Sequence, residues 1–443
     1  MTVGKIQEGA IEEFISGFNQ YEANQGYFDL RDRDEFPWWD LVRYRVQFAL
    51  CAERGFYGRQ KSAPSPKIVR ARSFMRQSWQ LVRDVATLSM LAPSHVQILV
   101  VSSRALPHVT TILDEEKRQG RRAIMFNKEG FAPAPHVAVA GQSIAFFTRL
   151  YANACQMPSD IEEDVRRLAD QIRKRFQSDV DFFALMSRKY CEHLAAQKAW
   201  SFVLNRSPAV DRIIYANDDT LKTLVFLAHG RGIATEEAQH AYMGRSHIGF
   251  SYPPLTRLPE TLPDRVIINR DTGDITYPVH KVIVQRHPTN QATDTTRDLD
   301  VLIAASPVCR DETIGIVTAL ADKGLRLAVK LHPMQTQESS GLRAHFPPEI
   351  VAIHTGSEDF CTLASRAHVF VPANVTSTTA LEAVENGARL VVVDFGGVKR
   401  TSMNDGIVSA RADSLEALPN VIWSQLNTKH PAAGGSKGIC HET

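Results

Sequence analysis

Short apolar runs separated by helix-length segments constrain the fold of this chain more than any other feature. Residues 96–101 and 212–216 form such runs in the first half, and residues 326–330 and 390–393 form them in the second. Apolar runs without polar alternation are typical of strands covered on both faces. Their alternation with segments of helical periodicity predicts parallel α/β sheets.

The length of 443 residues predicts two domains of about 200 residues rather than one core. Residues 252–263 (YPPLTRLPETLP) are proline-dense and lack periodicity, as expected of a linker. We therefore predict a helical N-terminal region over residues 1–92 that packs on the first domain, Rossmann-like domains over residues 93–255 and 264–424, and a flexible tail over residues 425–443.

Composition disfavours several classes of protein. Lys and Arg total 51 against 49 Asp and Glu, whereas nucleic-acid-binding proteins are usually more basic. The six cysteines form no C-x-x-C pair, and no cluster of carboxylates has metal-ligand spacing, so we expect neither a metal nor a cofactor. The N-terminus lacks an apolar signal core, and prolines and polar residues interrupt the uncharged stretches 85–103 and 130–148. We expect a cytoplasmic protein.

A cluster of hydroxyl residues follows the strand-like run 369–372. Ser377, Thr378 and Thr379 stand where a helix begins. Hydroxyls cap free N–H groups there, and the positive end of the helix dipole attracts anions. In a parallel sheet this turn lies at the carboxyl edge, where ligands bind. One hydroxyl is enough for a plain helix cap, so we interpret the cluster as a phosphate site.

His332 and Pro333 follow another apolar run, residues 327–331. The proline keeps His332 out of helical conformation, so the imidazole should project at the same carboxyl edge. There it can donate a hydrogen bond to a phosphate or a leaving group. The alternative is a structural histidine, and the same dipeptide recurs at residues 287–288.

Titratable residues follow two strand-like runs in the first half. Glu237 and His240 lie at the end of one run, and Asp218 and Asp219 follow the other. A carboxylate or imidazole in such a place can act as a general base. The alternatives are a polar surface loop for the first pair and a helix cap for an aspartate of the second.

A basic segment precedes the first predicted sheet. Residues 54–83 contain eight Lys or Arg and no Asp or Glu. On a helix over residues 68–91, at ~100° per residue, one side carries Arg72, Arg76, Trp79 and Arg83, and the other carries Phe74, Leu81, Val85 and Leu88. The basic side is suited to anionic lipid headgroups at the inner face of the plasma membrane, or to a phosphate-bearing acceptor. The alternative is a solvated basic face.

Three motifs together resemble those of a known class of enzymes. They are the His-Pro pair at 332–333, Ser377-Thr378, and the segment Glu237-Ala238-Gln239-His240 with Tyr252-Pro253 after it. They resemble bacterial surface-polysaccharide glycosyltransferases of GT-B fold, including capsule biosynthesis proteins, and are similar to the CMP-sugar sialyl- and Kdo-transferases. The resemblance covers mainly residues 212–395. It implies an α/β, GT-B-like fold in which two Rossmann-like domains with parallel sheets face a cleft.

The resemblance also implies roles for individual residues. His332, Pro333 and residues 377–379 would hold the donor phosphate, and Glu382 would contact the nucleotide. The acceptor proton would go to Glu237, His240, Asp218 or Asp219, without a metal. The expected activity transfers a sugar from a CMP- or UDP-sugar to a surface-polysaccharide or lipid-linked glycan acceptor. The alternatives are a sugar-nucleotide 2-epimerase, a CDP-alditol phosphotransferase of the same fold, or a non-catalytic component of polysaccharide assembly or export.

Overall fold

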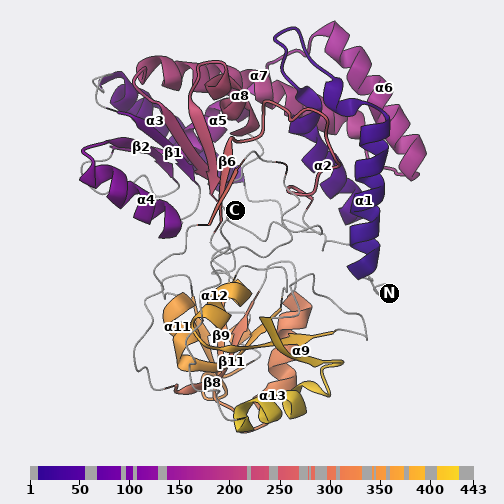
Figure 1. The fold of residues 1–443 in the computed structure, drawn as a ribbon, viewed down its shortest axis with the longest axis vertical. Coiled ribbons are helices and arrows are strands. Elements are labelled where there is room, and N and C mark those ends of the chain that lie inside the picture. The colour runs from indigo at the N-terminus through magenta and orange to yellow at the C-terminus, as the bar shows by residue number, and fades with distance from the viewer. Residues whose placement is uncertain are drawn as a thin grey trace, which may run out of the picture. The chain divides into compact units, whose positions relative to one another are not determined.

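The computed structural model divides the chain into two compact units, Met1–Pro288 (unit 1) and Thr289–Thr443 (unit 2). Figure 1 colours the chain from indigo at the N-terminus to yellow at the C-terminus. The described residues are 8–54, 67–90, 96–102, 107–127, 137–216, 221–238, 248–268, 278, 281–284, 297–305, 310–331, 342–343, 346–355, 360–373, 379–394 and 407–428.

Unit 1 is built on a parallel sheet that has seven strands in the described residues, in the order β3-β2-β1-β4-β5-β6-β7. The strands are β1 (Ile98–Ser102), β2 (Ala123–Asn127), β3 (Val137–Ala140), β4 (Arg212–Ala216), β5 (Ala234–Ala238), β6 (Arg265–Ile268) and β7 (Lys281–Val284). The chain reverses its direction of travel across the sheet between β1 and β4. That reversal is the topological switch point of a Rossmann-like sheet.

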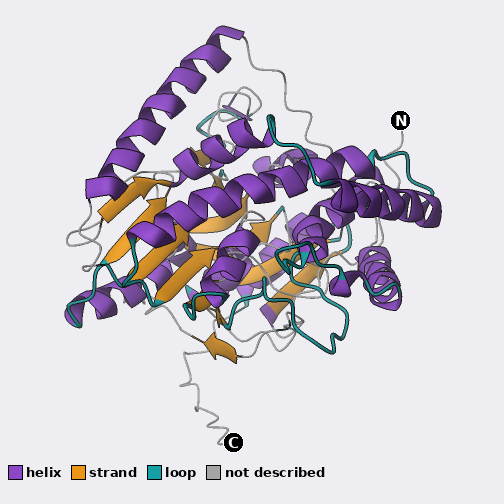
Figure 2. Ribbon diagram, turned by 90° about the horizontal axis from the view of Figure 1, so that it is seen from above, coloured by secondary structure: helices purple, strands orange, loops and turns teal. Residues whose placement is uncertain are grey.

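Helices cover both faces of this sheet (Figure 2). Successive side chains of a strand point to opposite faces, so β1 contributes to two cores. Ile98 and Val100 pack with α4 (Pro107–Arg118), and Leu99 packs with α7 (Phe182–Arg206). The α7 face also carries α3 (Lys67–Met90), α5 (Gly141–Ala152) and α8 (Leu221–His229).

The N-terminal helices pack on unit 1 through an aromatic core. They are α1 (Glu8–Asn24), the short 3-10 helix η1 (Tyr27–Asp29) and α2 (Trp38–Glu53). Phe18, Trp38 and Trp39 are buried against α6 (Ser159–Phe176), α7 and β6. Because this core includes residues of the sheet itself, the N-terminal region is an integral part of unit 1.

Unit 2 repeats the Rossmann-like order with six parallel strands in its described residues, β10-β9-β8-β11-β12-β13. The strands are β8 (Leu299–Ala304), β9 (Leu327–Lys330), β10 (Val351–His354), β11 (Ala367–Pro372), β12 (Arg389–Val393) and β13 (Val408–Ala412). One face carries α9 (Arg310–Ala321) and α13 (Leu418–Asn427); the other carries α11 (Phe360–Arg366) and α12 (Thr379–Glu385). The predicted α/β class, with two Rossmann-like parallel sheets and a helical N-terminal region, is confirmed.

The predicted boundary between the domains is wrong. β6 pairs with β5 and β7 pairs with β6, so residues 265–284 complete the first sheet, although the sequence placed them in the second domain. Residues 252–263 are not a linker either, because Tyr252 and Leu262 are buried in the aromatic core. Prolines prevent regular helix and strand structure but do not prevent burial. The composition of this segment therefore did not distinguish an exposed linker from a buried irregular segment. The predicted tail begins too early, since α13 continues to Asn427.

No helix among the described residues is long and apolar enough to cross a bilayer. The uncharged stretch 130–148 includes β3 and the first eight residues of α5, which directly follows that strand. Residues 85–103 include the end of α3 and all of β1. Each stretch is about as long as a membrane-spanning helix, but it contains residues of two separate elements, one strand and one helix.

Candidate functional site

The switch point of unit 2 lies between β8 and β11, and β9 flanks β8 on the other side. The ladder continues to the strand ends: Ala305 N donates to Lys330 O at 2.9 Å, and Ala373 N donates to Ala304 O at 3.0 Å. Because the strands are parallel, β9 and β11 end at one edge of the sheet. With β8 between them, these ends are about 10 Å apart. Hence the chain leaves the sheet toward His332 and toward Ser377 at the same edge.

Most of the predicted phosphate-binding residues cannot be placed individually. His332, Pro333, Ser377 and Thr378 lie outside the described residues. Thr379 is the first residue of α12, and Glu382 lies in the first turn of that helix; both are partly exposed. The structure therefore describes the strand ends and the helix that frame the predicted site.

α12 is held against the sheet by two small residues and by an arginine beyond its end. Ala380 and Ala383 are buried against Phe370 and Leu390. Gly387 follows the helix with a positive φ of 84°, and its carbonyl accepts a hydrogen bond of 2.7 Å from Arg297. The positive φ favours glycine at this turn, and a Cβ there would also displace the Arg297 guanidinium. These contacts fix where α12 begins relative to β11.

In unit 1, the two neighbouring glutamates of β5 have different surroundings. Glu236 is buried and accepts a hydrogen bond of 3.0 Å from Arg212 Nε, and Arg265 lies 3.4 Å away. Arg212 also pairs with Glu116 of α4. Glu236 thus joins the strands to α4 through ion pairs. We predicted a group of titratable residues at this strand end. Of these, Glu236 is engaged in ion pairs that hold the fold together.

Glu237 points to the opposite face of the sheet, because neighbouring residues of a strand alternate. It is buried and lies opposite Tyr215 of β4 in the ladder. Burial raises the pKa of Tyr215 well above its ordinary value, and the nearby Glu237, Tyr252 and Asp40 raise it further. These four groups therefore gather on one face near the carboxyl ends of β4 and β5. The other predicted base candidates, His240, Asp218 and Asp219, lie outside the described residues.

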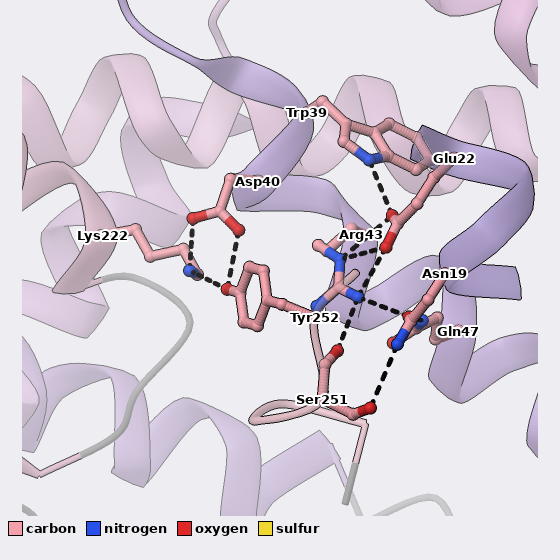
Figure 3. Close-up of polar contacts among 9 residues, drawn as sticks. All are labelled: Asn19, Glu22, Trp39, Asp40, Arg43, Gln47, Lys222, Ser251 and Tyr252. Carbon is pink, nitrogen blue, oxygen red and sulfur yellow. Dashed lines mark hydrogen bonds and ion pairs between the residues drawn. The ribbon is translucent and has the colours of Figure 1, made fainter. Parts of the chain in front are cut away.

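A lysine whose side chain is 17% exposed contacts two members of this group, Asp40 and Tyr252 (Figure 3). Lys222, in the first turn of α8, donates to Asp40 Oδ2 at 2.5 Å and to the Tyr252 hydroxyl at 2.9 Å. Tyr252 donates to Asp40 Oδ1 at 2.7 Å, and Thr261 donates to Oδ2 at 2.6 Å. Burial works to raise the pKa of Asp40, but the pairing with Lys222 outweighs it and holds that pKa below the usual range.

A second buried ion pair continues the network (Figure 3). Arg43 Nη2 lies 2.7 Å from Glu22 Oε1 and donates to Ser251 O at 2.8 Å. Its guanidinium also lies over the Tyr252 ring, 4.2 Å from the centroid. Trp39 Nε1 donates to Glu22 Oε2 at 2.9 Å. The helices α1 and α2 thereby hold Ser251 and Tyr252 in place beside Lys222.

We did not predict Asp40, Arg43 or Lys222 from the sequence as members of a site. One local signal exists: a lysine in the first turn of a helix is unfavourable next to the positive end of the helix dipole, so Lys222 needs a partner. That partner, Asp40, is 182 positions away in the chain. No spacing rule connects residues so far apart.

Another buried group, His193 of α7, predicts a pH dependence of stability. Its Nδ1 lies 2.9 Å from Thr223 Oγ1, and its ring stacks on Phe36 with centroids 3.7 Å apart. Asp32 Oδ2 lies 3.9 Å from Nε2. Burial, with a smaller contribution from Lys189, lowers the pKa of His193 to about 3.

In the unfolded chain the imidazole titrates near 6.5, so between these two values unfolding takes up a proton and stability falls as the pH falls. Urea unfolding at pH 7.5 and pH 5 should show a loss of about 2 kcal/mol that is due to His193. His193→Gln, which cannot be protonated, should lose correspondingly less over the same interval. If both proteins lose the same free energy, His193 is not the group responsible.

Within the part of the chain that the structure describes, no group of three or more His, Cys, Asp and Glu residues could hold a metal ion.

No protein-family model matches the chain, and no curated protein matches it. Solved structures match it at low identity. The glycotransferase of kitacinnamycin is 13% identical, with 76% of this chain and 92% of that chain covered and a TM-score of 0.43. UDP-GlcNAc 2-epimerase from Methanocaldococcus jannaschii is 10% identical, with 75% and 93% covered and a TM-score of 0.44. Os79 from O. sativa in complex with UDP is 13% identical, with 75% and 91% covered and a TM-score of 0.43.

Proposed function

We propose that this protein is a GT-B-type glycosyltransferase that moves a sugar from a nucleotide-activated donor to a glycan acceptor. The supporting observation is the arrangement of the strand ends in unit 2. β9 and β11 end at one edge on either side of β8, and the sequence places His332 and the hydroxyl cluster directly after them. In sheets of this order, ligands bind at the carboxyl edge beside the switch point.

In this proposal unit 2 binds the donor, a CMP- or UDP-sugar. Residues 377–379 bind the phosphate through their hydroxyls and through the free N–H groups where the chain enters α12. His332, held out of helical conformation by Pro333, donates a hydrogen bond to the same phosphate, and Glu382 contacts the nucleotide. As the bond between the sugar and the phosphate breaks, these donors stabilise the negative charge on the departing nucleotide, a role that a metal has in other enzymes.

Unit 1 binds the acceptor, a surface-polysaccharide or lipid-linked glycan. Its hydroxyl oxygen forms the new bond to the sugar, and its proton passes to a general base. Glu237 is the base candidate that the described residues support best, because it is buried near the carboxyl edge beside Tyr215 and close to the Lys222 network. His240, Asp218 and Asp219 remain candidates for the same role. Lys222, Asp40 and Tyr252 would position the surrounding backbone.

A thermal unfolding screen against CMP, UDP, CDP and their sugars tests the donor assignment. A ligand present at about 100 times its dissociation constant stabilises the folded state by about 2.7 kcal/mol, which raises Tm by several degrees. We expect such a shift with one nucleotide family. The double variant Ser377→Ala/Thr378→Ala should lose it, whereas Thr428→Ala, which removes a hydroxyl at the end of α13, should keep it.

The outcomes of this screen distinguish the competing functions. A protein that no nucleotide or nucleotide sugar stabilises would contradict the proposal and favour the non-catalytic assembly component. Stabilisation by a UDP-sugar, with conversion of that sugar to its 2-epimer and no acceptor required, would identify an epimerase. Stabilisation by CDP-alditols alone would identify the phosphotransferase. Transfer of the sugar to an added glycan is the expected result.

A further inference from the structure

α3 exposes an unusual row of apolar side chains. Met75 is 64% exposed, Trp79 72% and Val82 61%. Spacings of four and three residues place them on one side of the helix. Trp79 is the most exposed large apolar side chain among the described residues. We call Met75, Trp79 and Val82 the apolar row.

The opposite side of α3 attaches the helix to unit 1. Leu88 and Asp84 are buried, and Leu88 packs in the core that contains Leu99 and Trp200. The helix packs along α5 and meets β3, the strand at one edge of the sheet. α3 is therefore anchored along one side, and the apolar row projects from the other side into solvent.

The sequence predicted the anchored side only in part. We placed Val85 with Leu81 and Leu88 on the packing side, but Val85 is 41% exposed. The exposed side of α3 therefore carries more apolar residues than the sequence predicted. Met75, Val82 and Val85 are exposed in addition to the predicted Trp79. A solvated basic face does not account for three large apolar side chains that are more than half exposed.

The sequence of α3 is basic up to the end of the apolar row. Residues 67–83 carry five Lys or Arg and no Asp or Glu, and the next residue, Asp84, is buried. Arg83 lies next to the row, and its side chain is 57% exposed while it contacts Asp84 at 3.3 Å. A protein partner would need a matching acidic surface, whereas an anionic bilayer offers negative headgroups above an apolar layer. Basic residues near such a surface are attracted to its negative charge.

We infer that α3 is a membrane-binding helix that inserts Met75, Trp79 and Val82 among the headgroups of an anionic phospholipid bilayer. Arg83, beside the row, contacts the headgroup phosphates. Helices of this kind lie in the plane of the interface, and their binding strength grows with the apolar area that they bury. Tryptophan is enriched at this depth, because its ring is apolar and its N–H remains polar. This inference does not depend on the proposed enzymatic activity.

Co-sedimentation of the full chain with vesicles tests the inference. One set of vesicles contains phosphatidylcholine alone, and the other contains phosphatidylcholine with about one third phosphatidylglycerol. We expect the protein to bind the anionic vesicles in low salt and to bind the neutral ones much more weakly. Raising the salt to 0.5 M should weaken binding, because it shortens the range of the charge attraction to about 4 Å.

Two variants separate insertion from simple charge attraction. Trp79→Ser/Val82→Ser should bind anionic vesicles at least about tenfold more weakly, since it removes most of the apolar area of the row. Trp423→Ser is the matched control, because it removes a tryptophan that is 42% exposed on α13 in unit 2. It should bind as the unmodified protein does. Far-ultraviolet circular dichroism and Tm should be unchanged in both variants.

Three results would overturn the inference. The first is that the unmodified protein fails to bind anionic vesicles, in which case a protein partner becomes the better explanation of the apolar row. The second is equal binding to neutral and anionic vesicles. The third is that Trp79→Ser/Val82→Ser binds as tightly as Trp423→Ser.

Discussion

Replacing Glu22 by glutamine is expected to lower the free energy of unfolding by about 3–5 kcal/mol, a large fraction of the stability of a typical domain. Its side chain is 0% exposed and that of its partner Arg43 is 1% exposed, with 2.7 Å between the paired atoms. Glutamine keeps the shape of the side chain but removes its charge. The Arg43 cation then remains buried without a counter-ion, which is the costly outcome. Urea unfolding of the full chain at constant pH, followed through the transition of unit 1, measures the loss in free energy of unfolding.

Two further variants test this explanation. Glu162→Gln removes a carboxylate from an exposed pair with Arg166 one helical turn away, and should cost about 0.5 kcal/mol or less. The double replacement Glu22→Leu/Arg43→Met removes both charges and should recover part of the stability that Glu22→Gln loses. Recovery is incomplete because Trp39 Nε1 and Ser251 O lose their hydrogen-bond partners. If Glu22→Gln costs no more than Glu162→Gln, the buried pair does not hold the N-terminal helices in place.

His332→Ala is expected to lower kcat/KM for sugar transfer about 10²–10³-fold, the usual cost of removing one preorganised donor from a developing negative charge. The variant loses the proposed hydrogen bond to the departing phosphate and leaves the apolar strand before it intact. Tm without ligand should therefore remain unchanged. Steady-state kinetics with the nucleotide sugar identified in the thermal screen measures the effect.

His287→Ala is the matched control, because it changes the other His-Pro dipeptide of the chain. We expect it to keep near-normal activity. An His332→Ala protein with near-normal kcat/KM would remove His332 from the mechanism. A loss of equal size in both variants would indicate a general effect on folding rather than on the phosphate.

Most of the strands were predictable because their signal is local. The runs near residues 96, 212, 326 and 390 became β1, β4, β9 and β12. Each contains an unbroken run of at least three apolar residues, as expected of a strand buried on both faces of a parallel sheet. β3, β6 and β13 were missed. β3 and β6 contain only four residues each (VAVA and RVII), and polar residues interrupt the five residues of β13 (VSARA).

The boundary between the units was not predictable in the same way. A strand signal near residue 281 does not say which sheet the strand joins. That choice depended on pairing with β6, which in turn pairs with β5. The prolines of residues 252–263 indicated irregular backbone correctly, but their burial beneath the N-terminal helices is a matter of tertiary packing.

The candidate site was likewise predictable only in part from the sequence. The sequence alone showed that polar residues follow the apolar strands. It also predicted that the residues after the strands of one sheet lie at one edge, because parallel strands bring their carboxyl ends to the same edge whatever their order. Only the tertiary structure decided that Glu236 belongs to ion pairs, that Glu237 faces the other side, and that Lys222 meets Asp40 and Tyr252. The physical reason is distance along the chain. Local periodicity in the sequence is enough to assign a residue to a strand or to one face of a helix, but it does not identify a contact with a distant segment. The partner of a buried charge is chosen by packing between segments that lie 182 or 212 residues apart.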